Sequence, residues 1–383
     1  KDATDELTFA RKHFYQPHKF EDTFGHTTRT TYDDTSLRIV EIVDPVGDTT
    51  RAEYNYRVLQ PTLLIDCNGN CTAAAFDTRG LVVATAVLGK QKPLGEFGDT
   101  LVGVKLDLAL TDLQAFEQNP VAQAPALLGK ATTRVVYDVL RFLPPQGGTP
   151  ARPVFAATLA RELHNKNEPN EDYKPEDHIQ CKFSFSDGFG REIQQKVRTT
   201  SGPLQATDAA IASPRWIGSG WTIFNNKGAP VRQYEPFFTA THEFEFRRLE
   251  GVSPILFYDP VGRAVATLRP DHSWEKVVFD PWQVTAWDAD DTVLIDPLTD
   301  PDVGEFFRRL PASQWPLIDG ASPTWHKIRV PLPGNKPSQA LLDLFPGDDS
   351  KAIWRRTEEM AAAGKTEGHA NTPMRKHFDT LGH

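Results

Sequence analysis

The chain has 383 residues, which is enough for one or two domains with an ample core and excludes a small disulfide-stapled protein. Its 42 basic and 51 acidic residues give a net charge of -9, which argues against a dedicated nucleic-acid surface or an anchor for anionic membranes. Glycine and proline number 26 and 30, so the composition favours a β-rich fold with many turns over a helical bundle.

The longest nearly apolar run, Leu81 to Leu88, is far shorter than the roughly 20 residues that a membrane-spanning helix needs. The first residues, KDATDELTFARKHF, lack the order of basic, apolar and small residues that marks a secretion signal, and they contain no initiator methionine. We therefore expect the chain to be a fragment of a larger protein.

A repeat with a period of 22 residues occupies the first eighty residues or so. Five columns align across three consecutive rows without a gap. The columns hold Asp22, Asp44 and Asp66; Gly25, Gly47 and Gly69; Thr28, Thr50 and Thr72; Tyr32, Tyr54 and Phe76; and Asp33, Asn55 and Asp77. Glycine makes up only 26 of the 383 residues, so chance does not account for agreement in all five columns.

Each row of the repeat predicts one β-hairpin, because a period of about 22 accommodates two strands of roughly seven residues and two turns of about four. In the turn, the aspartate can bond its own backbone and the glycine accepts a positive φ. Threonine and the aromatic residue favour a pleated strand, and we expect the aromatic residues of adjacent rows to stack as a ladder. The runs Leu37 to Val43 and Val58 to Ile65 do not alternate cleanly, which leaves open a sheet without a single dry face.

A second signature recurs later without a strict period: an aromatic residue, Asp or Asn, two variable residues and Gly, often followed by Arg. Its clearest copy is YDPVGR, with Tyr258, Asp259, Gly262 and Arg263. Looser copies begin at Phe76, Ser186, Phe224 and Phe378. Each copy predicts a turn between strands, and the last is expected to start a further repeat.

Short helical stretches are expected over Thr111 to Leu128, interrupted by Pro120 and Pro125. A strand-like run follows at Thr133 to Phe142. The segments 144–152 and 165–177 are polar and contain proline, which is typical of loops.

Further helices are expected near the C-terminal end. Asp300 to Asp302 make a helix start for VGEFFRRL, with Pro311 as its stop. Ser338 can cap a short helix at QALLDLF. Asp348 or Asp349 can begin a longer helix that runs to Ala363 and ends at Gly364.

The three cysteines, Cys67, Cys71 and Cys181, are too few and odd in number for a disulfide framework. The run CNGNC leaves open a cross-turn disulfide or half a zinc site, but two ligands do not complete a zinc shell. The other rows of the repeat have threonine or proline in place of Cys67 and Cys71. We therefore expect the cysteines to be structurally neutral.

Motifs of catalysis and metal binding are incomplete in this sequence. HEFEF (His242 to Phe246) begins like a zinc-protease helix, but it lacks the second histidine and alternates like a strand. Ser219 lacks the glycine pattern of a nucleophile elbow, and no spacing marks a pair of glycosidase carboxylates. We predict no enzyme activity, no cofactor and no metal site.

The DxxG turns, YDPVGR and the string RWIGSGWTIFNNKGAPVRQYEPFF (Arg215 to Phe238) resemble the Rhs/YD-repeat proteins. In particular, they resemble the C-terminal part of the B component of the Tc insecticidal toxin complexes. The strings YRVLQPTLLIDCNGN, FSDGFGREIQQK and DPDVGEFFRRLP extend the resemblance over essentially the whole chain. It implies a mainly β fold, in which YD/Rhs-repeat hairpins wind into a large curved sheet as a shell segment with a partly helical insertion.

The resemblance also implies a function. In such proteins the shell encloses a cytotoxic polypeptide cleaved from the partner C component and delivers it into a channel-forming A component. A non-catalytic wall segment of a secreted assembly is therefore expected. Its partners would be the remainder of the shell, a C-component-like Rhs protein and, through parts absent from this chain, the A component, with no nucleic acid and no direct membrane insertion. A cell-surface YD-repeat adhesin that binds glycans or a receptor is the alternative, which a glycan array would distinguish.

The patterns and the resemblance together divide the chain into five regions. Residues 1–90 hold the YD-type repeats of period 22, and residues 91–177 form a mixed connecting region with short helices and strands. Residues 178–289 form a second YD-repeat strand block. Residues 290–370 form the partly helical insertion, and residues 371–383 start a further repeat.

Overall fold

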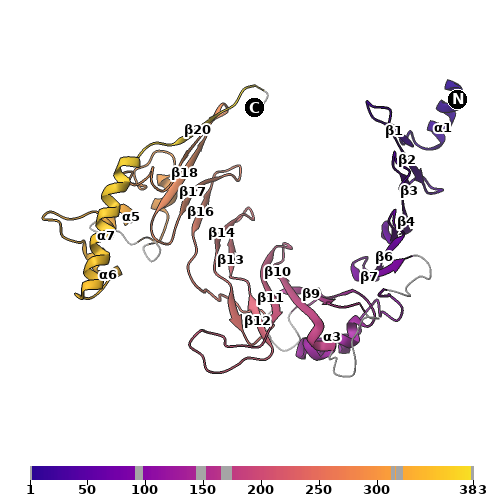
Figure 1. Ribbon diagram of the computed structural model, residues 1–383, viewed down its shortest axis with the longest axis horizontal. Helices are drawn as coiled ribbons and strands as arrows, with labels where there is room; N and C mark the ends of the chain where they lie inside the picture. The colour runs from indigo at the N-terminus through magenta and orange to yellow at the C-terminus, as the bar shows by residue number, and fades with distance from the viewer. Residues whose placement is uncertain are drawn as a thin grey trace. The chain divides into compact units, whose positions relative to one another are not determined.

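The computed structural model describes residues 2–90, 98–143, 152–164, 175–311, 315 and 322–380. The chain forms two compact units, each built on antiparallel β-sheet (Figure 1). Unit 1 comprises residues 1–218 and 238–244, and unit 2 comprises residues 219–237 and 245–383. The predicted mainly β fold is confirmed.

One sheet of thirteen strands forms most of unit 1. Strands β1 to β12 follow one another across it in chain order (Figure 1). Strand β15 pairs with β12 at the edge. The strands are β1 (Lys19–Glu21), β2 (Thr27–Tyr32), β3 (Ile39–Val43), β4 (Thr49–Asn55), β5 (Gln60–Ile65), β6 (Asn70–Phe76), β7 (Val82–Lys90), β8 (Thr133–Asp138), β9 (Val154–Arg161), β10 (Ile179–Ser186), β11 (Glu192–Thr199), β12 (Arg215–Gly218) and β15 (Phe237–Thr239). Sequential antiparallel pairing satisfies the backbone of each strand with its nearest neighbours along the chain.

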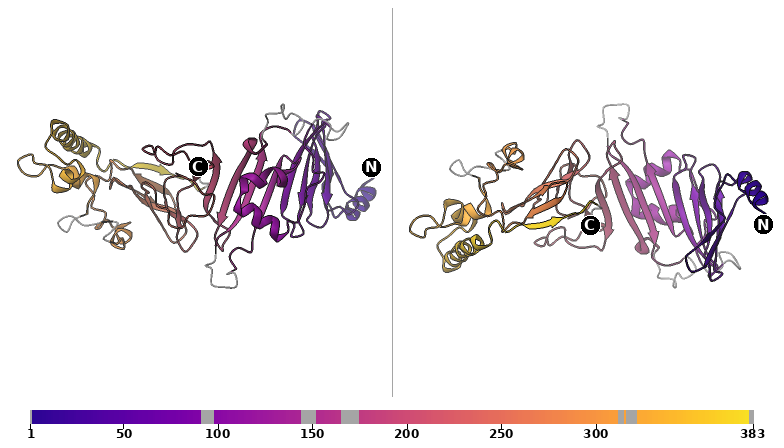
Figure 2. Two further views of the ribbon diagram at one scale, coloured as in Figure 1. Left: turned by 90° about the horizontal axis from the view of Figure 1, so that it is seen from below. Right: turned by 90° about the horizontal axis from the view of Figure 1, so that it is seen from above.

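Two helices of unit 1 cover one face of this sheet, where the magenta helices of Figure 2 lie. They are α2 (Leu110–Gln118) and α3 (Pro120–Leu128), while α1 (Ala3–Lys12) precedes the sheet and the 3-10 turn η2 (Pro175–His178) precedes β10. Phe116 and Leu128 of the two helices are buried against Ala157 and Phe183 of the sheet. The core of unit 1 is therefore on the helix-covered face.

The predicted interruption at Pro125 is wrong, because α3 runs through that residue from Pro120 to Leu128. Pro120 itself is the first helical residue, after Asn119, whose side chain accepts a hydrogen bond from the Ala122 N–H at 3.1 Å. A proline at the first position costs nothing, and Pro125 removes one intrahelical hydrogen bond from a helix that packing holds in place.

Unit 2 contains a two-stranded sheet, β13 and β14, and a five-stranded sheet in the order β16 to β20. The strands are β13 (Thr222–Phe224), β14 (Pro230–Gln233), β16 (Ile255–Tyr258), β17 (Ala264–Leu268), β18 (Trp274–Phe279), β19 (Gln283–Trp287) and β20 (Met374–His377). The helices are α4 (Gly304–Arg308), α5 (Trp325–Arg329), α6 (Gln339–Leu344), α7 (Ser350–Thr366) and the 3-10 turn η3 (Glu367–His369). Phe257, Trp274 and Phe307 form the centre of its core.

Two of the three predicted helix starts near the C-terminal end are confirmed, whereas the start predicted at Asp300 to Asp302 gives only the short α4, whose N-cap is Val303 and makes no side-chain bond. The Ser338 side chain accepts from the Leu341 N–H at the start of α6, and the Asp349 side chain accepts from the Ala352 N–H at the start of α7. The predicted stop at Gly364 is wrong, because α7 continues to Thr366. Gly364 does not take the positive φ of a helix cap, and the neighbouring Ala363 is fully buried, so packing extends the helix.

The predicted strand at His242 to Phe246 is also wrong, because these residues lie outside every strand. The His242 Nε2 atom instead lies 2.8 Å from the carbonyl oxygen of Glu117, and its ring lies 5.1 Å from that of Phe183. Side-chain contacts rather than a strand ladder hold this segment. Cys67, Cys71 and Cys181 are free thiols.

Most of the loops predicted over 144–152 and 165–177, and the end of the turn predicted from Phe378, lie outside the described residues. Among the helices that the structure describes, none is both long and apolar enough to cross a membrane.

Candidate functional site

The bend at Asp44 shows how each DxxG turn is built. Its Oδ1 atom accepts hydrogen bonds from the N–H groups of Val46 at 3.0 Å and Asp48 at 2.8 Å. Its carbonyl oxygen accepts from the Gly47 N–H at 3.1 Å, and its own N–H donates to the Asp48 carbonyl at 3.0 Å. With Gly47 at a φ of 94°, this is a three-residue hairpin loop made of a type I turn and a left-handed residue. We refer to this arrangement as a corner.

The same hydrogen bonds recur at seven corners. They begin at Asp22, Asp44, Asp66, Asp77, Asp187, Asn225 and Asp259. The glycine three residues later has a φ between 76° and 94° in each. A Cβ placed on Gly47 would meet no atom within 4 Å, so the backbone conformation rather than space requires glycine there.

Asp33 and Asn55 begin two variants of the corner. Ser36 and Leu59 take the left-handed position in them, each with a φ of 55°. The Asn55 loop has one residue more than the three-residue loop of the Asp44 corner, and the Asn55 carbonyl oxygen accepts from the Leu59 N–H at 2.7 Å. Every Asp and Asn of the predicted columns thus stands at a hairpin end.

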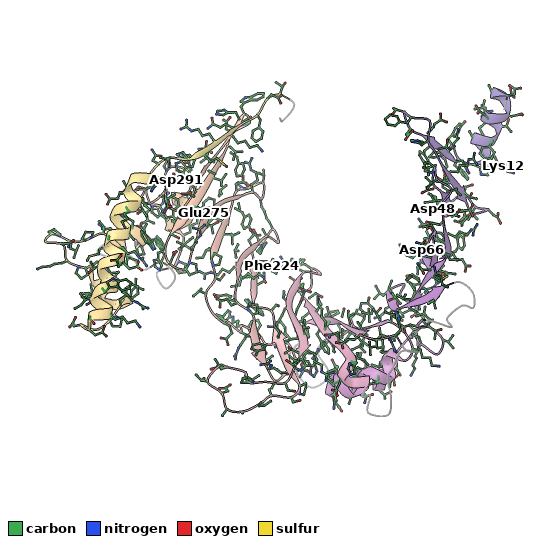
Figure 3. All side chains as sticks on the ribbon, in the orientation of Figure 1. Lys12, Asp48, Asp66, Phe224, Glu275 and Asp291 are labelled. Atoms are coloured by element: carbon green, nitrogen blue, oxygen red, sulfur yellow. The ribbon has the colours of Figure 1, made fainter. Side chains whose placement is uncertain are left out.

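The corners of the first repeats lie along two rims of the sheet, because antiparallel strands place alternate turns at opposite ends. The Asp22 rim consists of the corners that begin at Asp22, Asp44 and Asp66. The Asp33 rim consists of those that begin at Asp33, Asn55 and Asp77. Figure 3 labels Asp48 and Asp66, which belong to the Asp22 rim.

Side chains tie neighbouring corners of the Asp33 rim together. The Tyr56 hydroxyl donates to the Asp33 Oδ2 atom at 2.7 Å. The Arg57 guanidinium donates to the carbonyl oxygens of Asp77 at 2.6 Å and Thr78 at 2.9 Å. On the Asp22 rim, in contrast, the hydrogen bonds that the Asp22 and Asp44 side chains accept from backbone N–H groups stay within each corner.

At four corners the second carboxylate oxygen, Oδ2, accepts a hydrogen bond from the side chain four residues later. Its donors are His26 at 2.9 Å from Asp22, Asn70 at 2.8 Å from Asp66, Arg191 at 2.7 Å from Asp187 and Arg263 at 2.7 Å from Asp259. At the Asp44 corner this position is Asp48, which has no proton to donate at neutral pH.

Hydrogen bonds keep the corner carboxylates ionised. Those from the backbone and side chain of His26 lower the pKa of Asp22, and those from the side chain and backbone of Asn70 lower the pKa of Asp66. Burial opposes ionisation of Asp33, but the Tyr56 hydroxyl and backbone N–H groups outweigh it and lower its pKa to about 2. Burial likewise opposes ionisation of Asp77, whose pKa is nevertheless lowered by hydrogen bonds from backbone N–H groups and Arg79.

The predicted aromatic ladder is wrong. Among the described residues, no ring contact joins Tyr32 to Tyr54 or Tyr54 to Phe76, and the Tyr32 ring contacts His18 at 4.9 Å. The three residues lie on β2, β4 and β6, so they are two strand spacings, or roughly 10 Å, apart, which is beyond the range of ring pairs. The Tyr54 hydroxyl instead donates to the Ile39 carbonyl on the neighbouring strand at 2.9 Å.

The threonine column lies opposite an apolar column on the preceding strand. The sheet register pairs Phe20 with Thr28, Ile42 with Thr50 and Leu64 with Thr72. The sequence patterns above do not single out this apolar column, although it has the same period and lies two residues before each corner aspartate.

Threonine and apolar columns belong to one face of unit 1, where the paired strand residues from β1 to β9 are uncharged between the corners except for Lys90 at the end of β7, which pairs with Asn70. We name it the uncharged face. The register joins on it Phe20, Thr28, Thr30, Ile42, Thr50, Ala52, Leu64, Thr72, Ala74, Thr85, Val87, Thr133, Val135, Thr158 and Ala160. Ile42, Leu64 and Val87 are 39, 43 and 40% exposed. Lys182 of β10, which pairs with Thr158, is the first strand residue beyond β9 to add a charge.

The opposite face of the same sheet differs in both charge and cover. On β3 and β4 it carries Glu41 and Arg51, which form an ion pair of 2.8 Å. Farther along, its residues Ala84 and Ala157 are buried in the core with Phe116 of α2. A polypeptide that contacts the threonine and apolar columns of the uncharged face therefore forms no ion pair with them.

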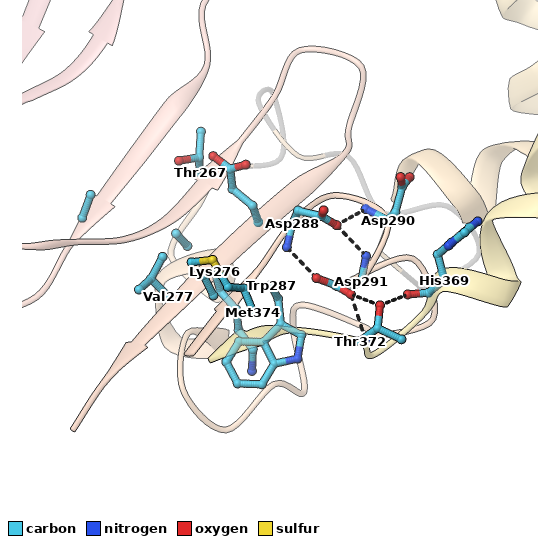
Figure 4. A pocket seen from close by; sticks show the side chains of 14 residues that line it. Thr267, Lys276, Val277, Trp287, Asp288, Asp290, Asp291, His369, Thr372 and Met374 are labelled. Carbon is cyan, nitrogen blue, oxygen red and sulfur yellow. Dashed lines mark hydrogen bonds between the residues drawn. The ribbon is translucent and has the colours of Figure 1, made fainter. Parts of the chain in front are cut away.

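A pocket of about 660 Å³ lies in unit 2 beside β17 to β19 (Figure 4). Two of its acidic groups are bound internally: Asp291 accepts from the Thr372 N–H and hydroxyl, and Asp288 accepts from the Asp290 and Asp291 N–H groups. Lys276, on its lining, is held by Asp300 at 2.6 Å and Asp302 at 2.8 Å. These bonds join loops to the sheet.

Comparisons with known proteins give matches in structure only. No protein-family profile matches the chain, and no curated protein matches it. The structure titled "Crystal Structure of TcdB2-TccC3" matches at 22% identity, covering 73% of this chain and 13% of that chain, with a TM-score of 0.56. The TcdB2-TccC3-Cdc42 structure matches at 19% identity, covering 76% and 16%, with a TM-score of 0.57.

A third structure, of TcdB2-TccC3-TEV, matches at 19% identity over 73% of this chain and 16% of that chain, with a TM-score of 0.58. The chain thus spans about a sixth or less of the length of the chains it matches. It has the mainly β fold, with large antiparallel sheets, of a part of these Tc toxin chains.

Proposed function

We propose that the chain is a non-catalytic wall segment of a Tc-toxin-like shell that encloses a polypeptide and helps to deliver it. The uncharged face carries this proposal. A wall that holds an unfolded chain must touch many kinds of side chain without trapping any of them. Fixed charges make strong, specific pairs, whereas threonine and small apolar side chains make weak contacts that are spread over a large area.

The corner geometry supports the identity of the wall as a YD-type repeat. A single hairpin cannot bury a face alone, but lateral pairing with its neighbours satisfies backbone groups and extends the sheet. Seven corners share the same hydrogen bonds, so one turn geometry serves hairpins of both units. The likeness to TcdB2-TccC3 chains supports the same role at the level of the fold.

The partners follow from this proposal. The segment would pair with the remainder of its own shell and with a C-component-like Rhs protein, and an A component would receive the delivered polypeptide through other parts of the shell. The assembly would be exported, and the segment itself would neither bind nucleic acid nor insert into a membrane.

Photo-cross-linking in the assembled shell tests the proposal. A photoreactive phenylalanine derivative is introduced at Leu64 on the uncharged face or, as the matched control, at Arg51 on the opposite face of the neighbouring strand. We expect the Leu64 position to cross-link to the enclosed polypeptide and the Arg51 position not to do so. Cross-linking from Arg51 alone, or from neither position, would contradict the proposal.

A further inference from the structure

A second pocket of unit 2, of about 370 Å³, has a chemistry that the shell role does not use. It lies between the end of β14, the segment that leads into β16 and the turn after β17. Its volume is within the range of sites for small organic ligands. Its polar lining residues are Arg232, Tyr234, Ser253, Arg269, His272 and Trp315.

The charged groups of the described lining are basic, and carboxylates lie just behind it: Glu275 pairs with Arg269, and the Glu235 side chain lies against Gly251. Two guanidinium groups, of Arg232 and Arg269, line it, and its described lining contains no Asp or Glu. The chain as a whole has a net charge of -9. The Arg269 Nη2 atom is held by the Glu275 Oε2 atom at 2.6 Å, which fixes the guanidinium while leaving it further N–H donors.

One wall of the pocket is aromatic. The rings of His272 and Trp315 stack with centroids 5.4 Å apart and an interplanar angle of 23°. The His272 Nδ1 atom lies 2.7 Å from the carbonyl oxygen of Pro323, so a proton on Nδ1 is donated there and the ring orientation is fixed. A flat apolar group could pack against this wall.

An unpaired donor also lies beneath the wall of the pocket. The Trp315 side chain is 3% exposed, and its Nε1 atom is buried without a hydrogen-bond partner. Leaving such a group unpaired costs on the order of 1 to 3 kcal/mol. Trp216 and Trp274 also have unpaired Nε1 atoms, but neither lines a pocket described above. Trp315 thus lines the pocket through its ring, and its N–H lies beneath the accessible surface.

We propose that this pocket binds a small aromatic anion, meaning a planar ring that carries a phosphate or carboxylate group. The guanidinium groups would bind the anionic oxygens by charge-assisted hydrogen bonds, and the His272 and Trp315 rings would pack against the planar ring. This site is independent of the proposed wall function, because it lies in unit 2, whereas the uncharged face lies in unit 1.

Isothermal titration of the full chain with phenyl phosphate tests this site. We expect saturable binding that weakens at least about tenfold in Arg232→Gln and in Arg269→Gln, since a charged hydrogen bond contributes roughly 1.5 to 3 kcal/mol and 1.4 kcal/mol is tenfold. Trp315→Phe keeps a ring at the pocket wall, so we expect it to weaken binding less than either arginine variant does. Arg263→Gln, at a corner outside the pocket, is the matched control and should bind as the wild type does.

Two comparisons make the result decisive. Inorganic phosphate should bind more weakly than phenyl phosphate, and benzyl alcohol, which has the ring without the charge, should not bind. Melting curves of each variant identify loss of folding, and an unfolded variant is replaced by Arg→Lys at the same position. Absence of saturable phenyl phosphate binding to the wild type, or equal affinity in all variants, would overturn the proposal.

Discussion

The two rims of the first repeats build the same bend from different residues. On the Asp22 rim, glycine fills every left-handed position, and the bonds of the Asp22 and Asp44 corners stay within each corner. On the Asp33 rim, Ser36 and Leu59 take left-handed positions, and side chains of Tyr56 and Arg57 reach from one corner to the next.

This difference separates two properties of the sheet edge. A residue other than glycine in the left-handed region costs roughly 1 to 2 kcal/mol, so the Asp33 rim needs compensating contacts. Tyr56 and Arg57 supply them. The bend itself therefore depends on the aspartate and the left-handed residue, whereas the bonds between neighbouring corners depend on Tyr56 and Arg57.

The largest effect is expected at the buried corner. Asp77 is 1% exposed and holds Arg79 at 2.8 Å, so Asp77→Ala removes the corner bonds and leaves the N–H groups of Arg79 and Leu81 without their acceptor. We expect a loss of about 3 kcal/mol, against about 1 kcal/mol for Asp44→Ala on the other rim. Urea unfolding, monitored by hydrogen exchange of the amides of unit 1, measures the loss of stability in both variants. Equal losses would count against the contrast between the rims.

Gly47→Val tests the left-handed position on the Asp22 rim. A β-branched residue at a φ of 94° is strained even though its Cβ meets no atom, so we expect a loss of about 2 kcal/mol. Cys71→Ser is the control, because its buried thiol lies 3.8 Å from the Gly69 carbonyl, to which a serine hydroxyl can donate. We expect the smaller loss there; equal melting temperatures would contradict the turn assignment.

Tyr56→Phe tests the tie between corners through acid titration. Without the hydroxyl, the pKa of Asp33 should rise from about 2 toward its ordinary value of 3.8. A carboxyl whose pKa is lowered by folding contributes stability above its unfolded pKa and loses it as the pH falls through the folded pKa. The variant should therefore lose less stability between pH 4 and pH 2. Carboxyl NMR titration measures the shift, and an unchanged Asp33 pKa would rule out the tie.

The smallest expected effect is a gain. Asp48→Arg gives the Asp44 corner the donor that Arg263 provides to Asp259 at 2.7 Å. Because this pair is exposed, we expect a gain of about 0.5 kcal/mol at low salt that disappears near 1 M salt. Asp48→Gln, which can donate without a charge, is the control; a gain that persists at high salt would show a different cause.

The corners could be predicted from the sequence because their chemistry is local. The aspartate, the glycine and the bonds between them lie within five residues, so a column of each is visible in the repeat. The helix starts at Ser338 and Asp349 were predictable for the same reason. The stop at Gly364 was not, because burial of Ala363 decides it.

Features that depend on pairing across strands could not be predicted in this way. The aromatic ladder assumed that residues one period apart are neighbours, whereas a second strand separates them. Only the register of the strands shows that Phe20, Ile42 and Leu64 lie on one side of the sheet, so the uncharged face could not be predicted from the sequence. The basic pocket combines Arg232, Arg269 and Trp315, whose positions in the sequence give no sign of contact.

The carboxylate of a corner divides its work between its two oxygens. Oδ1 binds the backbone, and at four corners Oδ2 accepts from the side chain four residues later, which is histidine, asparagine or arginine. Substitutions at that fourth residue can therefore alter the surface potential along a rim without inserting or deleting a residue. The surface of the sheet edge can thus vary in sequence while the spacing of the strands stays constant.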